Sequence, residues 1–137
     1  MLLSRPESDF LNDLNAYRAA NHLATVKPLP VVQVCTTWMS EDMQKRWSAG
    51  SGLSHIDSMG RDFGPRVRAC GYDQNAYKGE ILAAGFTDGH AVFNAWKASS
   101  THNPIMLGSQ YRYVGVSMTN GLWDVDFVSL YDNTYAE

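Results

Sequence analysis

The sequence predicts an α+β fold in which helices pack on a small antiparallel sheet, and three observations support this class. Two long segments near the N-terminus carry apolar side chains at helical spacing. Two β-rich runs close the chain, and Asn120-Gly121 between them is a strong hairpin signal. Helices first and paired strands last is an order typical of helices laid against one sheet.

The first half of the chain should be mainly helical. Ser8-Asp9 is the expected N-cap of a first helix, because apolar residues follow at helical spacing from Phe10 to Tyr17; this helix should end near residues 21–22. Between Val31 and Trp47 an apolar residue recurs at every fourth position, which predicts a second helix that stops at residues 50–52. Its large apolar side chains are expected in the core: Trp38, Met39, Met43 and Trp47. Its charged side chains are expected mostly in water: Glu41, Asp42, Lys45 and Arg46.

The second half alternates shorter elements. Residues 50–61 form an irregular loop, and a short helix follows over roughly 62–70, with Gly71 in the left-handed conformation after its end. Residues 80–84 form a buried strand or extended segment, and Thr87-Asp88 caps another helix that stops before Pro104. The hairpin strands are expected over 111–118 and 122–130.

Length and charge restrict the function. The 137 residues are typical of one domain, expected to span 1–137. The formal net charge is -3, so the chain lacks the basic excess of a nucleic-acid binder, and this class of protein is excluded. No apolar run reaches the ~18 residues of a membrane span. The first residues carry no apolar signal-peptide core, so the protein is cytosolic or begins after a removed signal.

Few residues could carry chemistry. The four histidines form no short zinc motif, and no nucleophile elbow or phosphate-binding glycine loop is present. Glu80 stands beside an apolar stretch, where a buried carboxylate requires a partner such as a distant histidine. Base rates favour the alternative that Glu80 begins a strand and faces water. Cys35 and Cys70 are compatible, on composition alone, with one disulfide or with two buried thiols.

An ordered set of segments from about residue 10 to 130 resembles the CAP superfamily, which comprises cysteine-rich secretory proteins, antigen five and pathogenesis-related proteins, and in particular its compact bacterial members. No single segment decides the resemblance, but the order of the set is specific. The segments are Leu14-Asn15-Ala16-Tyr17-Arg18, Ser54-His55, Arg66, Ala69-Cys70-Gly71-Tyr72, Gly79-Glu80-Ile81-Leu82-Ala83-Ala84-Gly85, Ala95-Trp96-Lys97-Ala98-Ser99, His102-Asn103-Pro104-Ile105-Met106-Leu107 and Tyr113-Val114-Gly115-Val116.

The resemblance implies an α-β-α sandwich with a central cleft that contains histidines and carboxylates. Carried over by position, the cleft residues are His55, Glu80 and His102. His55 and His102 are the implied ligands of a divalent cation, most readily Zn²⁺. The extracellular character of the family also favours a bridge between Cys35 and Cys70 over free thiols.

This sequence departs from the family at two positions. The second glutamate of the cleft usually lies three residues after the tryptophan of the fourth helix, but Ser99 occupies that position here. Asp57 is a candidate replacement. Ile81 stands where the family usually has asparagine, which removes an amide beside Glu80. His22 and His90 match no functional position and are expected to be solvated.

Three functions are compatible with these residues. The first, which we favour, is a secreted, non-catalytic binding module whose cleft holds a divalent cation. The second is a hydrolase, either metal-assisted or with a hydroxyl nucleophile beside His102, which would be Ser99, Ser100 or Thr101. The third is a lipid or sterol carrier. The partner would be a small molecule, a lipid or an extracellular protein, with no nucleic acid and no membrane span.

Overall fold

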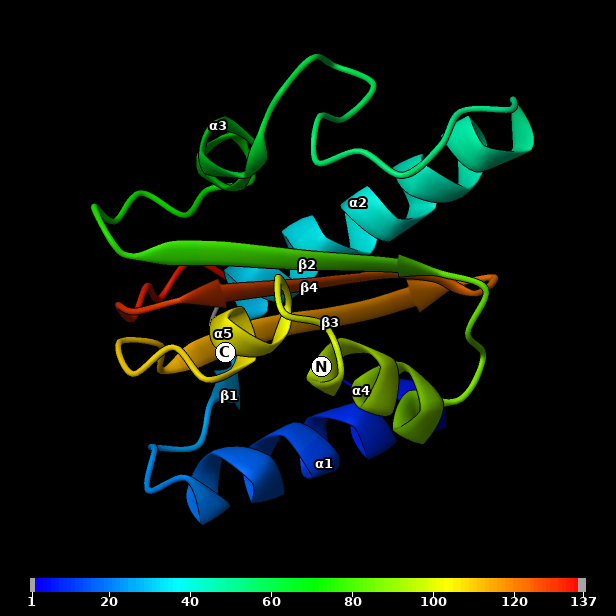
Figure 1. Ribbon diagram of the computed structural model, residues 1–137. Helices are drawn as coiled ribbons and strands as arrows, with labels where there is room; N and C mark the ends of the chain where they lie inside the picture. The colour runs from blue at the N-terminus through cyan, green and yellow to red at the C-terminus, as the bar shows by residue number, and fades with distance from the viewer. Residues whose placement is uncertain (1, 136–137) are drawn as a thin grey trace.

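The computed structural model describes residues 2–135, which form three layers. A sheet lies in the middle, with α2 and α3 on one face and α1 and α4 on the other (Figure 1). The helices are α1 (Arg5–Ala20), α2 (Pro30–Ser48), α3 (Phe63–Ala69), α4 (Gly89–Lys97) and α5 (Asn103–Met106). The strands are β1 (Lys27–Pro28), β2 (Lys78–Ala84), β3 (Tyr113–Thr119) and β4 (Leu122–Val128). The α+β class and the α-β-α sandwich are confirmed.

The sheet has the order β1-β3-β4-β2. The expected hairpin joins β3 to β4, and Asn120 and Gly121 at its turn have φ values of 49° and 81°, as a two-residue hairpin turn requires. Strand β2 pairs antiparallel with β4 and forms one edge. The sheet is mixed because the short β1, which the sequence did not predict, pairs parallel with β3.

Alternation along the strands divides the core between the two faces. Trp123, Val125 and Phe127 of β4 pack with side chains of α1 and α4, whereas Leu122 and Val128 pack with side chains from α2 and its side of the sheet. Helix α2 approaches the sheet closely at Gly115, where a β-carbon would lie 2.3 Å from Thr36 Oγ1. The side chains of β4 are therefore covered on both faces.

Two expectations for the helices were wrong in detail. Helix α1 begins after Ser4, not Ser8, because Ser4 and Glu7 form a reciprocal capping box one turn earlier. In α2, Met39 and Met43 are buried as expected, but Trp38 and Trp47 are 36% and 48% exposed, and Asp42 is only 7% exposed. Asp42 is buried because its carboxylate accepts hydrogen bonds from Arg46 and from the backbone of Ser58.

The outer edge of β3 is covered by side chains beyond the short β1. The amide of Gln33 bonds to both the backbone N–H and the carbonyl of Val116, at 2.8 and 2.7 Å. One oxygen of Glu7 accepts a hydrogen bond from the backbone N–H of Met118 at 2.8 Å. These contacts satisfy backbone groups that a neighbouring strand would otherwise bond.

Candidate functional site

Glu80 lies on the edge strand β2, on the face of the sheet covered by α2 and α3. It is 6% exposed, so the interpretation that Glu80 faces water was wrong. Its carboxylate bonds to Arg66 of α3 through Oε2 and to His55 Nδ1 through Oε1, the latter at 2.8 Å. Burial opposes ionisation, but the hydrogen bond with His55 and the charge of Arg66 lower the pKa of Glu80 to about 2.

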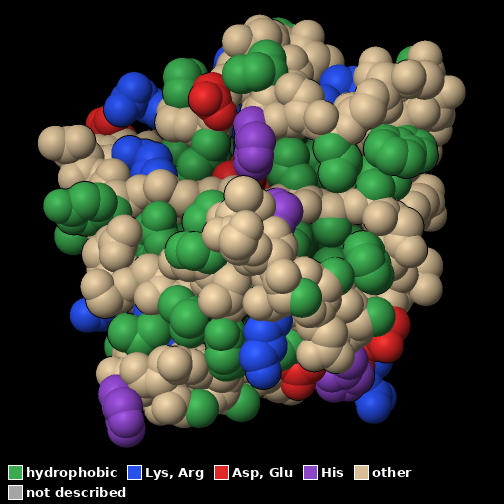
Figure 2. Space-filling view, in the orientation of Figure 1, with side chains coloured by type: hydrophobic (Ala, Val, Ile, Leu, Met, Phe, Trp, Pro, Cys, Tyr) green, Lys and Arg blue, Asp and Glu red, His purple; other side chains and the backbone are tan. Residues whose placement is uncertain are grey.

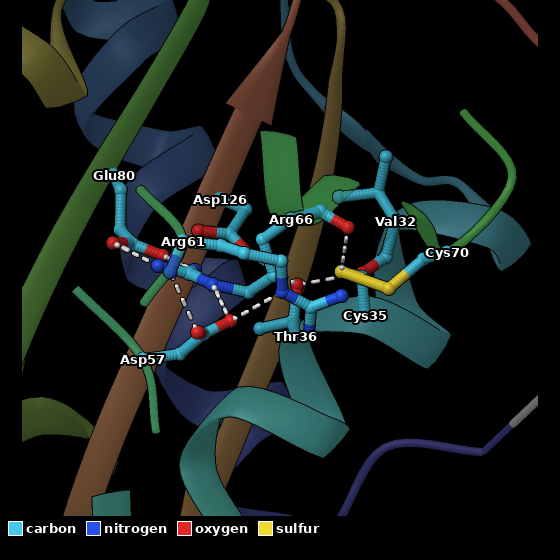
Figure 3. Close-up of a disulfide and its surroundings, with 9 residues drawn as sticks. All are labelled: Val32, Cys35, Thr36, Asp57, Arg61, Arg66, Cys70, Glu80 and Asp126. Carbon is cyan, nitrogen blue, oxygen red and sulfur yellow. Dashed lines mark hydrogen bonds and ion pairs between the residues drawn. A yellow bond between two sulfur atoms is a disulfide. The ribbon is translucent and has the colours of Figure 1, made fainter. Parts of the chain in front are cut away.

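Arg66 holds this side of the site together. Its side chain is fully buried and pairs with Glu80, and it also donates to the backbone carbonyl of His55. Its Nε lies 3.4 Å from Asp57 Oδ2, so the guanidinium joins the loop to strand β2 (Figure 3). Sequence reasoning noted Arg66 only as part of the family pattern and assigned it no role.

The expected Cys35–Cys70 disulfide is present and fixes α3 against α2. Cys35 lies in the middle of α2, and Cys70 is the C-cap residue of α3, one turn after Arg66. Figure 3 shows the bridge beside the ion pairs of Arg66. The covalent bond therefore limits the movement of the helix that carries Arg66.

His55 lies on the loop of residues 50–61 and reaches Glu80 from the α2–α3 side. Its side chain is 52% exposed. The hydrogen bond to Glu80 is the main reason that the pKa of His55 is raised above its ordinary value. Because Nδ1 is used by Glu80, Nε2 is the nitrogen left for a ligand, and no hydrogen bond to Nε2 is found within residues 2–135.

His102 comes from the opposite layer, between α4 and α5. Its Nδ1 lies 2.8 Å from Ser99 Oγ, and the neighbouring Asn103 accepts a hydrogen bond from Tyr17 of α1. Burial, and then the charge of His55, lower the pKa of His102. Histidine side chains lie close together in a hollow near the centre of the face in Figure 2. The structure thus brings His55, Glu80 and His102 to one edge of the sheet.

Ser99, at the position of the absent glutamate, is the partner of His102. Asp57, the suggested replacement, instead accepts hydrogen bonds from the backbone of Met59 and Arg61 and from the Arg61 side chain. Asp57 therefore shapes the loop that carries His55. A hydroxyl in place of a carboxylate leaves His102 oriented but without a negative partner, consistent with the lowered pKa of its ring.

Two buried aspartates beneath Glu80 were missed. Asp124 and Asp126 of β4 have no exposed surface, and their side chains lie on the same face of the sheet as Glu80. Their alternation with Trp123, Val125 and Phe127 is the pattern of a strand with one face in water. Helix α2 covers that face, which no local pattern reveals.

The other two histidines lie apart from the cleft. His22 is exposed in the turn after α1, and His90 at the start of α4 is 56% exposed in its side chain. His90 Nδ1 lies 2.6 Å from Asp13, and Asp9 and Asp88 are close to the same ring. Both histidines are solvated as expected, although His90 has acidic neighbours that the sequence did not indicate.

The sequence model of the cysteine-rich secretory protein family (CAP) matches residues 11–129. The chain belongs to this family. No curated protein sequence matches the chain. The CAP fold is shared with solved bacterial structures, each less than 20% identical to this chain.

One such structure is an extracellular protein of Bacillus anthracis that contains an SCP domain (TM-score 0.83, 19% identity, 95% of this chain and 45% of that protein). Another is an outer surface protein of Borrelia burgdorferi (TM-score 0.71, 18% identity, 92% of this chain and 96% of that protein). A third is a cysteine-rich secretory protein of Staphylococcus aureus (TM-score 0.69, 12% identity, 94% of this chain and 40% of that protein). This CAP chain spans less than half of the Bacillus and Staphylococcus proteins. No helix within residues 2–135 is long and apolar enough to cross a membrane.

Proposed function

We propose that this chain is an extracellular binding module whose cleft holds a divalent cation, most readily Zn²⁺, between His55 and His102, without turnover of its own. The observation that carries the proposal is that protein groups bond Nδ1 of both rings: Glu80 bonds His55, and Ser99 bonds His102. Each ring is therefore oriented with Nε2 left for a ligand. Zn²⁺ binds neutral imidazoles held in this way by a hydrogen bond at the other nitrogen.

The same contacts argue against the hydroxyl-nucleophile alternative. A triad would need a carboxylate that orients His102, but Glu80 bonds His55, and no hydrogen bond joins Glu80 to His102 within the described residues. Ser99 contacts Nδ1 of His102, the nitrogen that the orienting acid occupies in a serine triad. Binding of a cation requires fewer groups than hydrolysis does, and two oriented imidazoles support binding.

Calorimetric titration with Zn²⁺ tests the proposal. His55→Ala with His102→Ala should abolish the cleft binding, and His22→Ala is the matched control that should leave it unchanged. The whole series carries His90→Ala, because Asp9, Asp88 and His90 form an exposed group that could also take Zn²⁺. Unchanged Zn²⁺ affinity in the double variant would overturn the assignment.

Ser99→Ala tests how the cleft is organised. Loss of a group that orients a metal-ligating histidine typically weakens metal binding by roughly 10- to 100-fold. The exposed neighbour Ser100 provides the control, and Ser100→Ala should bind Zn²⁺ like the parent. Equal affinity in both variants would show that Ser99 has no part in orienting His102.

The lipid-carrier function remains a second candidate because of a groove elsewhere on the molecule. The groove has a volume of about 770 Å³ and lies between the start of α1, one side of α2 and the end of β3. Its apolar side chains include Leu2, Val34 and Met118. Native mass spectrometry of protein purified from cells should reveal a bound lipid if this function holds, and consistently lipid-free protein would count against it.

A further inference from the structure

Three carboxyl groups lie together beneath the histidine cleft. Glu80 of β2 is directly opposite Asp126 of β4 in the sheet, and Asp124 is two residues before Asp126 on the same face. One oxygen from each group lies within 4.8 Å of the other two. Asp124 and Asp126 are fully buried, and Glu80 is nearly so.

The positive side chains around this group do not balance its charge. Arg66 pairs with Glu80, while Arg61 pairs with Asp57. Within residues 2–135, neither Asp124 nor Asp126 forms an ion pair. If all three groups were ionised, one guanidinium would leave two negative charges uncompensated in the interior, where an isolated carboxylate is very costly.

Hydrogen bonding is also incomplete. Thr36 donates one hydrogen bond, at 2.9 Å, to Asp126 Oδ2. No donor from residues 2–135 reaches either oxygen of Asp124 or the other oxygen of Asp126. Unpartnered buried oxygens are rare in native proteins, and each requires a ligand, a water molecule or a proton.

We propose that Glu80, Asp124 and Asp126 form a second cation site, for a hard divalent ion such as Ca²⁺ or Mn²⁺, beneath the histidine cleft, with Glu80 common to both sites. The chemistry fits, because hard cations take carboxylate oxygens, and the ~5 Å that separates opposite oxygens around one Ca²⁺ accommodates the observed spacing. One ion of charge +2 would neutralise the two charges that Arg66 leaves. This set contains no imidazole, so it should favour different metal ions from the histidine cleft.

Protons compete with the ion for the same oxygens. Burial, reinforced by the neighbouring carboxyl groups, raises the pKa of Asp124 and of Asp126 well above the ordinary value. The ion must displace these protons, so binding should strengthen as pH rises and should release protons to the buffer. If protons alone satisfy the two aspartates, no ion will bind at any pH at which the protein is folded.

Titration with Mn²⁺, followed by the electron paramagnetic resonance signal of the free ion, tests the site at pH 7.5 and above. The parent and the His55→Ala/His102→Ala variant should bind one Mn²⁺ alike, whereas the isosteric Asp124→Asn should bind at least ten-fold more weakly. Zn²⁺ binding should respond in the opposite way, being lost in the histidine variant and kept in Asp124→Asn. The failure of one site is therefore distinguishable from the failure of the other.

A measurement on the parent protein avoids dependence on the folding of Asp124→Asn. Bound Mn²⁺ broadens nearby amide NMR signals, and those of residues 80, 124 and 126 should disappear first. Preferential broadening of residues 88–90 would place the ion at the exposed His90 group and overturn the proposal. Absence of any broadening in the folded protein would also overturn it and would assign the two aspartates to the protonated state.

Discussion

Removal of the disulfide between α2 and α3 should strongly destabilise the protein. The bridge joins Cys35 to Cys70, which are 35 residues apart, and the chain-entropy model assigns a loop of this length a stabilisation of about 4 kcal/mol. Cys35 is fully buried, so alanine is the appropriate replacement because it introduces no polar group. The melting temperature should fall by roughly 15 °C in a chain of this size.

Urea unfolding of the Cys35→Ala/Cys70→Ala variant measures the loss of unfolding free energy directly. The parent protein treated with a reductant is the matched control, because it loses the covalent bond but keeps both sulfur atoms in the core. Both proteins should lose unfolding free energy because the covalent bond is gone. The variant should lose somewhat more, because it also lacks the two sulfur atoms. A loss below about 1 kcal/mol in both proteins would refute the chain-entropy reasoning for this bridge.

Two further changes test the packing of α2 on the sheet and the electrostatics of the candidate site. Gly115→Ala should cost about 2 kcal/mol or more of unfolding free energy, because its methyl group would lie 2.3 Å from a hydroxyl oxygen of α2. Gly52→Ala, with no atom near the added methyl group, should cost little; equal losses in urea unfolding would contradict the packing argument.

Glu80→Gln should lower the pKa of His55, measured by NMR titration, because the hydrogen bond to the Glu80 carboxylate is the main cause of its raised value. In the parent, protonated His55 stabilises the fold fully below its unfolded pKa of about 6.5, and this contribution disappears as pH rises through the raised folded value. His102, with its lowered pKa, should titrate below His55; the reverse order would refute this account.

The parts of the structure that the sequence predicts well are those with local causes. The cap of the α4 segment, the hairpin at Asn120-Gly121 and the left-handed Gly71 each depend on the conformational preferences of a few adjacent residues. The predicted start of α1 was wrong for a related reason. Ser4 and Ser8 both precede suitable residues, and the reciprocal contact with Glu7 decides between them.

The candidate site was only partly predictable, because its contacts join segments that are distant in the chain. The family pattern indicated His55, Glu80 and His102, yet burial of Glu80 depends on Arg66, whose approach is set by packing of α3. Nothing local distinguishes Asp124 on a covered face from the same residue on a solvated face. The pairing of Ser99 with His102 likewise depends on the path of the chain after α4.

The side chains of Gln33 and Glu7 along the outer border of β3 have a consequence for behaviour at high concentration. An open strand border invites pairing with a second molecule, which leads to domain exchange or fibril growth. Here Gln33 imitates a neighbouring peptide group, and Glu7 adds a negative charge at the far end. These two side chains therefore oppose pairing of a second molecule at this border, where β1 supplies only two residues of the fourth strand.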